Sequence, residues 1–362
     1  MNPSILVGTS KGLVIFSEIS RNFQITEVHF EGLPISMVYI DERTDTWWVS
    51  LAHRHWGEKL HYSTDKGKRW NAAGLPSYAG IDYKPGSPAS LKKIWIMQHA
   101  GKDKPNCLWL GTEPGGLFYS EDNGIHFSLN EGLWNHPSRL DDKQWFGTGK
   151  DFPFIHSIIV DPRDSRHLYV GVSCAGVFES SDGGQSWHPK NRGLIASYLP
   201  NASAEIGHDP HRILLCESDP EVIWQQNHCG IFRSANGGED WKLVSREDQP
   251  PSYGFALAID HTDSNQAWVI PAASDESRIP PNLALSVYHT INGGVNWNPT
   301  NQGLPRQFAF DLVLRHAFIK ADEILAFGTN NGNVYASTNN GQIWRELASN
   351  LAPVCNIAVS LH

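Results

Sequence analysis

The sequence predicts an all-β fold, a seven-bladed β-propeller, and three observations carry this prediction. A short turn motif recurs six times at a nearly constant spacing along the 362 residues. Between its copies, apolar residues alternate or run in short bursts bounded by Gly, Pro and Asp, as strands require. No segment has the sustained apolar period of a helix. Because stacked repeats share one continuous core, we expect residues 1–362 to form a single domain.

The turn motif reads Ser/Thr-x-Asp/Asn-x-Gly-x-x-aromatic, and its chemistry is that of a tight turn. The Asp or Asn is expected to accept backbone N–H bonds from two residues further on, while Gly supplies a positive φ. The closing Trp or Phe is expected to be buried between neighbouring sheets. The distance from one copy to the next suits one four-stranded blade. The six copies span residues 63–70, 120–127, 180–187, 234–241, 290–297 and 337–344.

Four strands, a to d from the propeller axis outward, can be placed around each turn. The clearest copy has strand a at 156–162, strand b at 167–172 and strand c at 176–179, and Trp187 opens strand d. Their short apolar bursts end at Gly, Pro or Asp, which is typical of strand boundaries. The other a strands are expected at 36–40, 94–96, 211–215, 255–259 and 311–314.

The two ends of the chain together supply the seventh blade. Residues 5–9 and 12–16 have the pattern of strands b and c, followed by strand d near 24–30, but no strand a precedes them. Residues 354–360 have the pattern of a strand a with no partner strands after it. Pairing of the two ends closes the ring, so that the C-terminal strand completes the first blade and no blade edge stays open.

Composition disfavours several classes of function. The net charge is −9 and the basic residues are scattered, which argues against a nucleic-acid partner. No apolar run approaches the roughly 18 residues of a membrane-spanning helix, so no membrane partner is expected. The first residues lack the basic start and long apolar stretch of a signal peptide, which indicates a cytoplasmic protein. The five cysteines have irregular spacings and are expected to be reduced.

The repeated motif resembles the Asp-box (BNR) repeat and covers essentially the whole chain. Sialidases, xyloglucan-active hydrolases, sortilin-type receptors and photosystem assembly propellers carry this repeat. The chain most closely resembles bacterial propellers described as sialidase-like or as glycosyl hydrolases without a demonstrated activity. The segments that carry this resemblance are 53–57, 156–157, 226–230, 253–255 and 311–315. The resemblance implies the fold and leaves the activity open.

Sialidases proper use an arginine triad, a Tyr–Glu nucleophile pair and an Asp acid/base, and an early Arg-Ile-Pro motif carries the first arginine. In this chain Arg-Ile-Pro occurs at residues 278–280, late in the chain and inside the long b–c connection of the sixth blade. This departure from the family pattern argues against sialidase activity.

Histidines on one face of the expected propeller predict a metal site. The b–c loops and the beginnings of the inner strands lie on the face opposite the c–d turns, and a rigid scaffold commonly presents functional residues on such loops. His156 and His211 stand at nearly equivalent beginnings of strand a in adjacent blades, and His228 lies in the following b–c loop. Neutral imidazoles suit a divalent transition metal, so these three are the predicted metal ligands.

Charged residues on the same face predict two further kinds of chemistry. Glycoside hydrolysis needs two carboxylates about 5–10 Å apart, and the candidate catalytic residues are Glu113, Asp275 and Asp311. Guanidinium groups bind carboxylate or sulfate bidentately, and the candidate ligand-binding residues are His53, Arg54, His55, Arg278 and Arg315. By contrast, His208 and Asp209 look like loop residues near a blade edge.

Three functions stay open at this point. The first is an enzyme that acts on a carbohydrate or a related polar small molecule. The second is a non-catalytic propeller that binds a small-molecule or glycan ligand, or a protein partner. The third is a metal-dependent enzyme that uses the histidines. Trp134, Trp145 and Phe152 lie in a long insertion, either as a lid that stacks on a ring or as ordinary loop packing.

Overall fold

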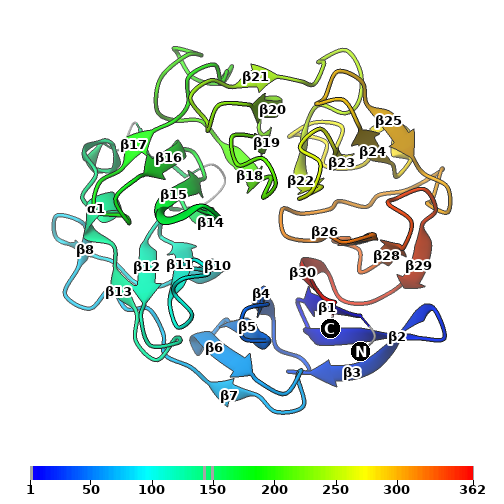
Figure 1. Ribbon diagram of the computed structural model, residues 1–362, viewed down its shortest axis with the longest axis horizontal. Helices are drawn as coiled ribbons and strands as arrows, with labels where there is room; N and C mark the ends of the chain where they lie inside the picture. Colours follow the sequence, from blue (N-terminus) through cyan, green and yellow to red (C-terminus); the bar gives the residue numbers. More distant parts are fainter. Residues whose placement is uncertain (1–2, 142–143, 148–150, 362) are drawn as a thin grey trace.

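The computed structural model describes residues 3–141, 144–147 and 151–361. Seven four-stranded antiparallel sheets stand around a common axis, and the two ends of the chain lie in the same blade (Figure 1). The predicted all-β, seven-bladed fold is therefore confirmed. We number the blades in chain order, beginning with the blade that contains the first strand, and keep the names a to d from the axis outward.

The inner half of each blade consists of strands a and b. The a strands of blades 1 to 7 are β30 (Val354–Ser360), β4 (Ile35–Asp41), β10 (Lys93–His99), β14 (Ile155–Asp161), β18 (Pro210–Leu215), β22 (Gly254–Ile259) and β26 (Phe318–Ala321). The b strands are β1 (Ser4–Thr9), β5 (Thr46–His53), β11 (Leu108–Glu113), β15 (Asp164–Val172), β19 (Ile223–Asn227), β23 (Ala267–Pro271) and β27 (Ile324–Gly328).

The outer half consists of strands c and d. The c strands are β2 (Gly12–Ile19), β6 (Gly57–Ser63), β12 (Leu117–Ser120), β16 (Gly176–Ser180), β20 (Gly230–Ser234), β24 (Val287–Thr290) and β28 (Val334–Ser337). The d strands are β3 (Asn22–His29), β7 (Asn71–Ala72), β13 (Ser128–Leu129), β17 (His188–Pro189), β21 (Lys242–Leu243), β25 (Asn298–Thr300) and β29 (Arg345–Ala348).

Few elements lie outside the blades. They are the hairpin of β8 (Asp82–Lys84) and β9 (Ser87–Pro88), the helix α1 (Glu131–Trp134), and the short 3-10 helices η1 (Pro137–Leu140) and η2 (Pro281–Leu283). Among the described residues, no helix has both the length and the apolar character needed to cross a lipid bilayer.

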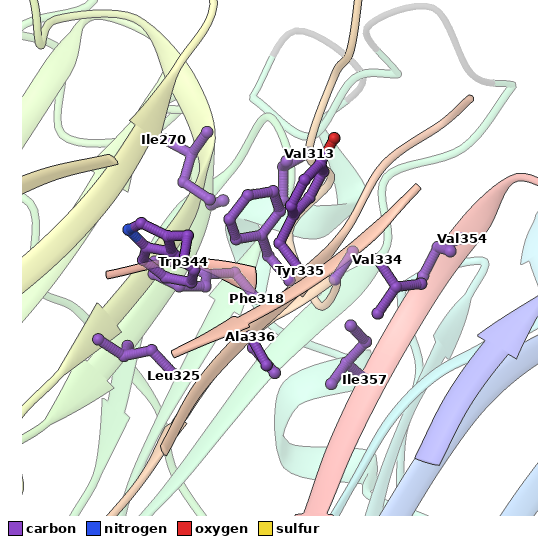
Figure 2. Packing of buried hydrophobic residues seen from close by; sticks show 14 of the residues in the cluster. Ile270, Val313, Phe318, Leu325, Val334, Tyr335, Ala336, Trp344, Val354 and Ile357 are labelled. Atoms are coloured by element: carbon purple, nitrogen blue, oxygen red, sulfur yellow. The ribbon is translucent and has the colours of Figure 1, made fainter. Parts of the chain in front are cut away.

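Strand β30 closes the ring, as the sequence predicts. It pairs antiparallel with β1 along the whole length of β1. Its side chains Val354 and Ile357 are buried in an apolar cluster that spans blades 6, 7 and 1. Figure 2 shows these two residues on one side of the cluster and Ile270 of β23 on the other. The core is thus continuous across the point where the chain ends meet.

The six c–d turns share one hydrogen-bond pattern, which the turn in blade 4 illustrates. The Ser180 hydroxyl donates to Asp182 Oδ1 at 2.8 Å and accepts from Gly184 N at 2.8 Å. Asp182 Oδ1 also accepts from Ser186 N at 3.0 Å. The same three bonds occur in the other five turns. The carboxylate therefore binds the N–H four residues on, not two as expected, because the hydroxyl occupies the nearer position.

The aromatic residue that ends each turn ties its blade to the preceding one. In blade 4 the buried Trp187 donates its indole N–H to Asn130 Oδ1 of blade 3 at 3.0 Å. In the next three blades the indole N–H donates to a backbone carbonyl of the preceding blade: Trp241 to Lys190, Trp297 to Val244 and Trp344 to Thr300. The repeated motif thus sets both the turn and the contact between blades.

In blade 7 the inner strand differs from the predicted one. The inner strand is β26, not residues 311–314. Those residues belong to an irregular segment in which Leu312 N donates to the side chain of Asn330 at 2.6 Å. The apolar alternation of this segment resembles that of a strand because an extended chain has the same period whether or not it is paired. The segment delivers Arg315 to aromatic rings of blades 4 and 6.

The insertion between blades 3 and 4 packs against the body of the propeller. Trp145 is 3% exposed and contacts Phe178 of β16, with ring centroids 5.3 Å apart. Trp134 contacts Tyr78 at 5.2 Å. Phe152 meets Tyr83 edge to face. These contacts support ordinary packing of the insertion. They do not support a lid that stacks on a ligand ring, because the two tryptophans are buried and have no exposed face.

Candidate functional site

The inner strands contain a β-bulge near one end, and the bulged residues surround the axis. In blades 1 to 6 the pairing between strands a and b skips one residue close to the beginning of strand a. A bulge changes the direction of a side chain and is common beside functional sites. The six skipped residues, which we call the bulge ring, are Cys355, Ser36, Trp95, His156, His211 and Phe255.

The bulge ring lies on the face that carries the b–c loops, which we call the mouth face. Here His211 meets two other polar side chains of blade 5: Asp209, just before β18, and His228, in the loop between β19 and β20. Asp209 Oδ2 is 3.3 Å from His211 Nε2 and 3.8 Å from His228 Nδ1. The potential ligand atoms of the three residues all lie within 4.8 Å of one another. We call these three residues the His–Asp cluster.

Asp209 is a buried carboxylate that accepts hydrogen bonds from neighbouring groups. Its Oδ1 accepts from Ser173 Oγ at 3.1 Å and from Cys174 N at 3.2 Å. Burial by itself would raise the pKa of Asp209, but the contact with His211 and the charge of Arg315 outweigh it and hold the pKa well below its usual range. Asp209 is therefore ionised at neutral pH.

Asp209 and its neighbour His208 also correct a sequence expectation. Both lie outside the strands, as expected of loop residues, but both are buried, with Asp209 only 4% exposed, so neither lies at an exposed blade edge. His208 bonds to Ala204 O at 2.6 Å, whereas Asp209 belongs to the cluster. No spacing signal marks Asp209, because it precedes strand β18 and the bulge at His211 interrupts the alternation of side chains there.

Both histidines of the cluster are oriented by their other ring nitrogen. His211 Nδ1 lies 2.6 Å from Gly254 O, and its ring stacks on Phe255 with centroids 4.5 Å apart. Burial lowers the pKa of His211 in spite of the nearby Asp209. His228 Nε2 faces Asp275 Oδ2 at 4.0 Å. The cluster is thus connected to blade 6 at two points.

Asp275 and Arg278 lie beside the cluster, on the b–c loop of blade 6, as the sequence predicts. Asp275 accepts a hydrogen bond from Tyr253 Oη at 3.0 Å and pairs with the Arg278 guanidinium. Partial burial would raise the pKa of Asp275, but the bonds from Arg278 and Tyr253 lower it overall. The Tyr253 ring also lies 5.5 Å from that of His228.

Arg315 lies between two aromatic rings contributed by other blades. Its guanidinium carbon is 5.3 Å from the Phe154 ring centroid and 5.1 Å from that of Phe255. Phe154 in turn stacks on Trp95 of blade 3, with centroids 4.1 Å apart. The Arg315 Nε is enclosed and has no hydrogen-bond partner. We call Phe154, Arg315 and Phe255 the arginine stack.

His156, the third predicted metal ligand, is not in the cluster. Its Nδ1 contacts Ser157 Oγ at 2.9 Å, and its Nε2 is enclosed without a partner. Burial and then the charge of Arg315 hold the pKa of His156 well below its usual value. The structure therefore groups His211 and His228 with Asp209, and His156 lies in the neighbouring blade beside them.

The remaining predicted ligand-binding residues lie in blade 2 and make local contacts. His53 Nδ1 accepts the backbone N–H of His55 at 3.1 Å and that of Trp56 at 3.0 Å, which shapes the tip of the β5–β6 hairpin. Arg54 and His55 are exposed, and Trp56 is 74% exposed. The hairpin stands on the mouth face, but blade 2 lies across the axis from blade 5 (Figure 1).

The predicted catalytic carboxylates Glu113 and Asp311 are held by their neighbours. Glu113 accepts from Trp95 Nε1 at 3.1 Å, and Asp311 accepts from Asn333 Nδ2 at 2.9 Å. Both side chains are buried. The structure does not bring them to the His–Asp cluster, where Asp275 alone of the three predicted carboxylates is found.

Glu58 is a mouth-face carboxyl that the sequence did not reveal. Its Oε2 accepts from Ser36 Oγ at 2.9 Å, Ser50 Oγ at 2.7 Å and Ile94 N at 3.2 Å, whereas Oε1 is enclosed without a partner. Burial raises the pKa of Glu58. It stands at the beginning of β6, directly after the segment 53–57, and only the fold shows that it is 5% exposed.

A seven-bladed propeller with a polar His–Asp–Arg site at its axis is the class of protein that these observations define. No protein-family model matches the chain. It is 21% identical over 231 residues to xyloglucanase Xgh74A of Acetivibrio thermocellus, covering 57% of this chain and 25% of the relative. It is 24% identical over 237 residues to an oligoxyloglucan-reducing end-specific xyloglucanase of Emericella nidulans, covering 55% and 26%.

Comparison with solved structures finds the same fold. The crystal structure of an ancestral GH74 enzyme matches with a TM-score of 0.56 and 17% identity, covering 90% of this chain and 38% of that one. At this identity the likeness shows the fold alone. The chain spans about a quarter of the length of the two curated relatives that it matches. It is thus a propeller of GH74-like fold with weak sequence similarity to xyloglucanases.

Proposed function

We propose that this propeller binds a carbohydrate that carries an acidic group, on the mouth face beside the His–Asp cluster and the arginine stack. The observation that carries the proposal is the placement of Arg315, whose guanidinium lies near the rings of both Phe154 and Phe255 while its Nε has no protein partner. The similarity to xyloglucanases supports a carbohydrate as the ligand.

The charges around the axis favour an acidic ligand. Burial lowers the pKa of Arg315 and lowers that of Arg212, in the inner strand β18 of blade 5, to about 10. Asp209 is the carboxylate whose charge acts on Arg315, and the pKa of Arg212 shows no carboxylate influence. A buried cation without a counter-charge is costly. Asp209 offsets one of these two positive charges, and a ligand carboxylate or sulfate would offset the other through bidentate bonds to guanidinium.

Aromatic side chains on the same face suit a sugar chain. Binding sites for small molecules combine apolar and aromatic walls with a few convergent polar groups. Tyr198, Tyr253 and Trp95 provide such walls around the axis. Trp56 is 74% exposed on the blade 2 hairpin and offers a further ring at the rim of the same face.

Binding, without hydrolysis, is what the carboxylates support. A two-carboxylate glycosidase needs one carboxyl with a raised pKa to act as the acid. Asp209 and Asp275, which flank His228, both have lowered pKa values. Glu58 has a raised pKa but is enclosed. We therefore propose a non-catalytic lectin-like role for the mouth face.

Calorimetric titration with acidic and neutral oligosaccharides tests the proposal. We expect oligogalacturonates to bind and neutral xyloglucan oligosaccharides to bind more weakly. Arg315→Met keeps the apolar stem between the rings and should weaken acidic-sugar binding by roughly 10–100-fold, the size of a lost charge-assisted hydrogen bond. Arg166→Met, which alters an exposed arginine on the opposite face, is the matched control. Equal binding of neutral sugars, or unchanged binding by Arg315→Met, would contradict the proposal.

A further inference from the structure

Asp209 lies close enough to each histidine of the cluster to share a metal ion with it, and the potential ligand atoms of all three residues lie within 4.8 Å of one another. A divalent transition metal binds nitrogen and oxygen ligands at about 2.0–2.2 Å, so two ligand atoms on one ion can be no more than about 4 Å apart. Asp209 Oδ2 lies 3.3 Å from His211 Nε2 and 3.8 Å from His228 Nδ1. Both separations lie within that limit.

The contact between Asp209 and His211 requires a cation. Gly254 O can only accept a hydrogen bond, so the 2.6 Å contact places the ring proton of His211 on Nδ1. The Nε2 of a neutral ring then presents a lone pair to the carboxylate oxygen of Asp209 at 3.3 Å. Two acceptors at this distance repel each other unless a positive charge lies between them. A metal ion bound by both atoms, or a second proton on His211, would supply it.

In each of the three side chains, the atom that would not bind the ion faces another group of the protein. His211 donates from Nδ1 to Gly254 O, and His228 turns Nε2 toward the carboxylate of Asp275. Asp209 uses Oδ1 to accept from Ser173 Oγ and Cys174 N, which leaves Oδ2 for the ion. Metal-binding histidines and carboxylates are supported by outer partners of these kinds, a backbone carbonyl or a carboxylate for histidine.

We propose that Asp209, His211 and His228 bind a divalent transition-metal ion and leave coordination positions open to a ligand. Two histidines and one carboxylate are the donor set of non-haem Fe²⁺ sites and, in another geometry, of catalytic Zn²⁺ sites. The site differs from the histidine triad predicted from the sequence, because Asp209 takes the place of His156. It stands independently of the carbohydrate proposal, since it rests on the cluster and not on the arginine stack.

The positive charge of Arg315 determines which kind of ligand the open coordination positions prefer. The guanidinium acts on both Asp209 and His211, so its charge opposes that of a bound cation. An anionic oxygen ligand that contacts the ion and Arg315 together would balance both charges. We expect such ligands to be preferred over neutral ones.

The test is a titration of untagged, chelator-treated full chain with Zn²⁺ and, separately, with Co²⁺ as a spectroscopic probe. We expect one ion per chain, visible Co²⁺ absorption bands and a rise in Tm, since an ion that binds only the folded state stabilises it. Asp209→Asn and His228→Gln should each lower the affinity at least 100-fold. Asp275→Asn, which removes only the outer partner, should lower it roughly 10–100-fold.

His167→Gln is the matched control, because His167 also lies between two carboxylates, Asp161 and Glu179, but outside the cluster. Its affinity for Zn²⁺ should match that of the unmodified chain. The proposal is overturned if the folded, metal-free protein shows no saturable one-to-one binding of either ion. It is also overturned if Asp209→Asn and His228→Gln, both folded, bind as tightly as the unmodified chain. No saccharide enters this titration, so its outcome leaves the carbohydrate proposal to be judged separately.

Discussion

On the far face of the propeller, six c–d turns repeat the same residues and the same three hydrogen bonds, whereas on the mouth face six inner strands repeat the same bulge with different residues. The turn of blade 4 can stand for the others because its Ser, Asp and Gly recur with only Thr and Asn as substitutes. The bulge ring instead holds Cys355, Ser36, Trp95, His156, His211 and Phe255. A repeated backbone with repeated side chains builds the ring, and a repeated backbone with unlike side chains builds the site.

Carboxylates also have different roles on the two faces of the propeller. The turns of blades 2 to 4 use Asp, whereas those of blades 5 to 7 use Asn with the same geometry. The turn therefore needs an oxygen acceptor and not a charge. Asp209 on the mouth face is different, because its charge lies against a histidine lone pair and beside Arg315.

The largest effect should follow from removal of the closing strand. Deletion of the residues after Leu351 takes β30 from blade 1, which exposes the unpaired edge of β1 and the apolar cluster that β30 covers. We expect loss of the cooperative thermal transition, measured by calorimetry. A truncated chain that melts within a degree or two of the full chain would show that closure does not stabilise the ring.

Two tryptophans, one on each face, should separate stability from binding. Trp187→Ala on the turn face removes a buried indole and its bond to blade 3, so we expect a loss of about 3–5 kcal/mol in the free energy of unfolding. Trp56→Ala on the mouth face removes a ring that is 74% exposed, so stability should change by less than about 0.5 kcal/mol. Urea unfolding measures both. If acidic-sugar affinity falls in Trp187→Ala and not in Trp56→Ala, the assignment of the two faces is wrong.

A carboxylate-to-amide change on each face should give contrasting results. Asp182→Asn reproduces the residue type of the turns in blades 5 to 7, so the free energy of unfolding should change by less than about 1 kcal/mol at neutral pH. In Asp209→Asn the amide N–H can donate to His211 Nε2, so the metal-free protein should melt at or above the original Tm. Added Zn²⁺ should then raise the Tm of Asp182→Asn but not that of Asp209→Asn. A rise in Tm on addition of Zn²⁺ in both variants would contradict this difference between the two carboxylates.

The smallest effect should be the acid response of the charged turns. Hydrogen bonds from His126, first through its backbone and then through its ring, lower the pKa of Asp122 to about 2, and contacts with Arg69 lower that of Asp65 to about 2 as well. A carboxylate with a lowered pKa stabilises the folded state above its unfolded pKa near 3.9. That contribution is lost as the pH falls from about 4 toward 2.

The variant with Asn at positions 65, 122 and 182 provides the comparison for this effect. It should lose less stability between pH 4 and pH 2 than the unmodified chain, because amides do not titrate. Urea midpoints at several pH values across this window measure the difference. Parallel loss of stability in both proteins would assign the acid response to other carboxylates.

The sequence predicted most of the strands because each depends on neighbouring residues. The turn motif requires its hydroxyl, acceptor and glycine within five positions, so it can be recognised without knowledge of the fold. The wrong prediction of a strand at residues 311–314 has the same cause. Their alternation is local, whereas a partner that decides between strand and irregular segment, such as Asn330, is distant in the chain.

The site was predicted only in part, for the same physical reason. His211 was singled out together with His156 because equivalent positions in adjacent blades can be counted along the chain, and His228 because it lies in the following b–c loop. Asp209 was missed because a single acidic residue before a strand has no pattern of its own, and its burial depends on Ser173 of another blade.

By itself, then, the sequence determined the ring: its turns, its blades, its closure by the C-terminal strand and the face on which polar loops gather. Local hydrogen bonds and a repeated apolar pattern specify these, and both are present in short stretches of chain. The tertiary structure decided which polar groups meet. Arg315 lies between rings from blades 4 and 6, and Asp209 faces His211 with its charge retained. Those contacts depend on the curvature of the ring, which brings distant inner strands around one axis.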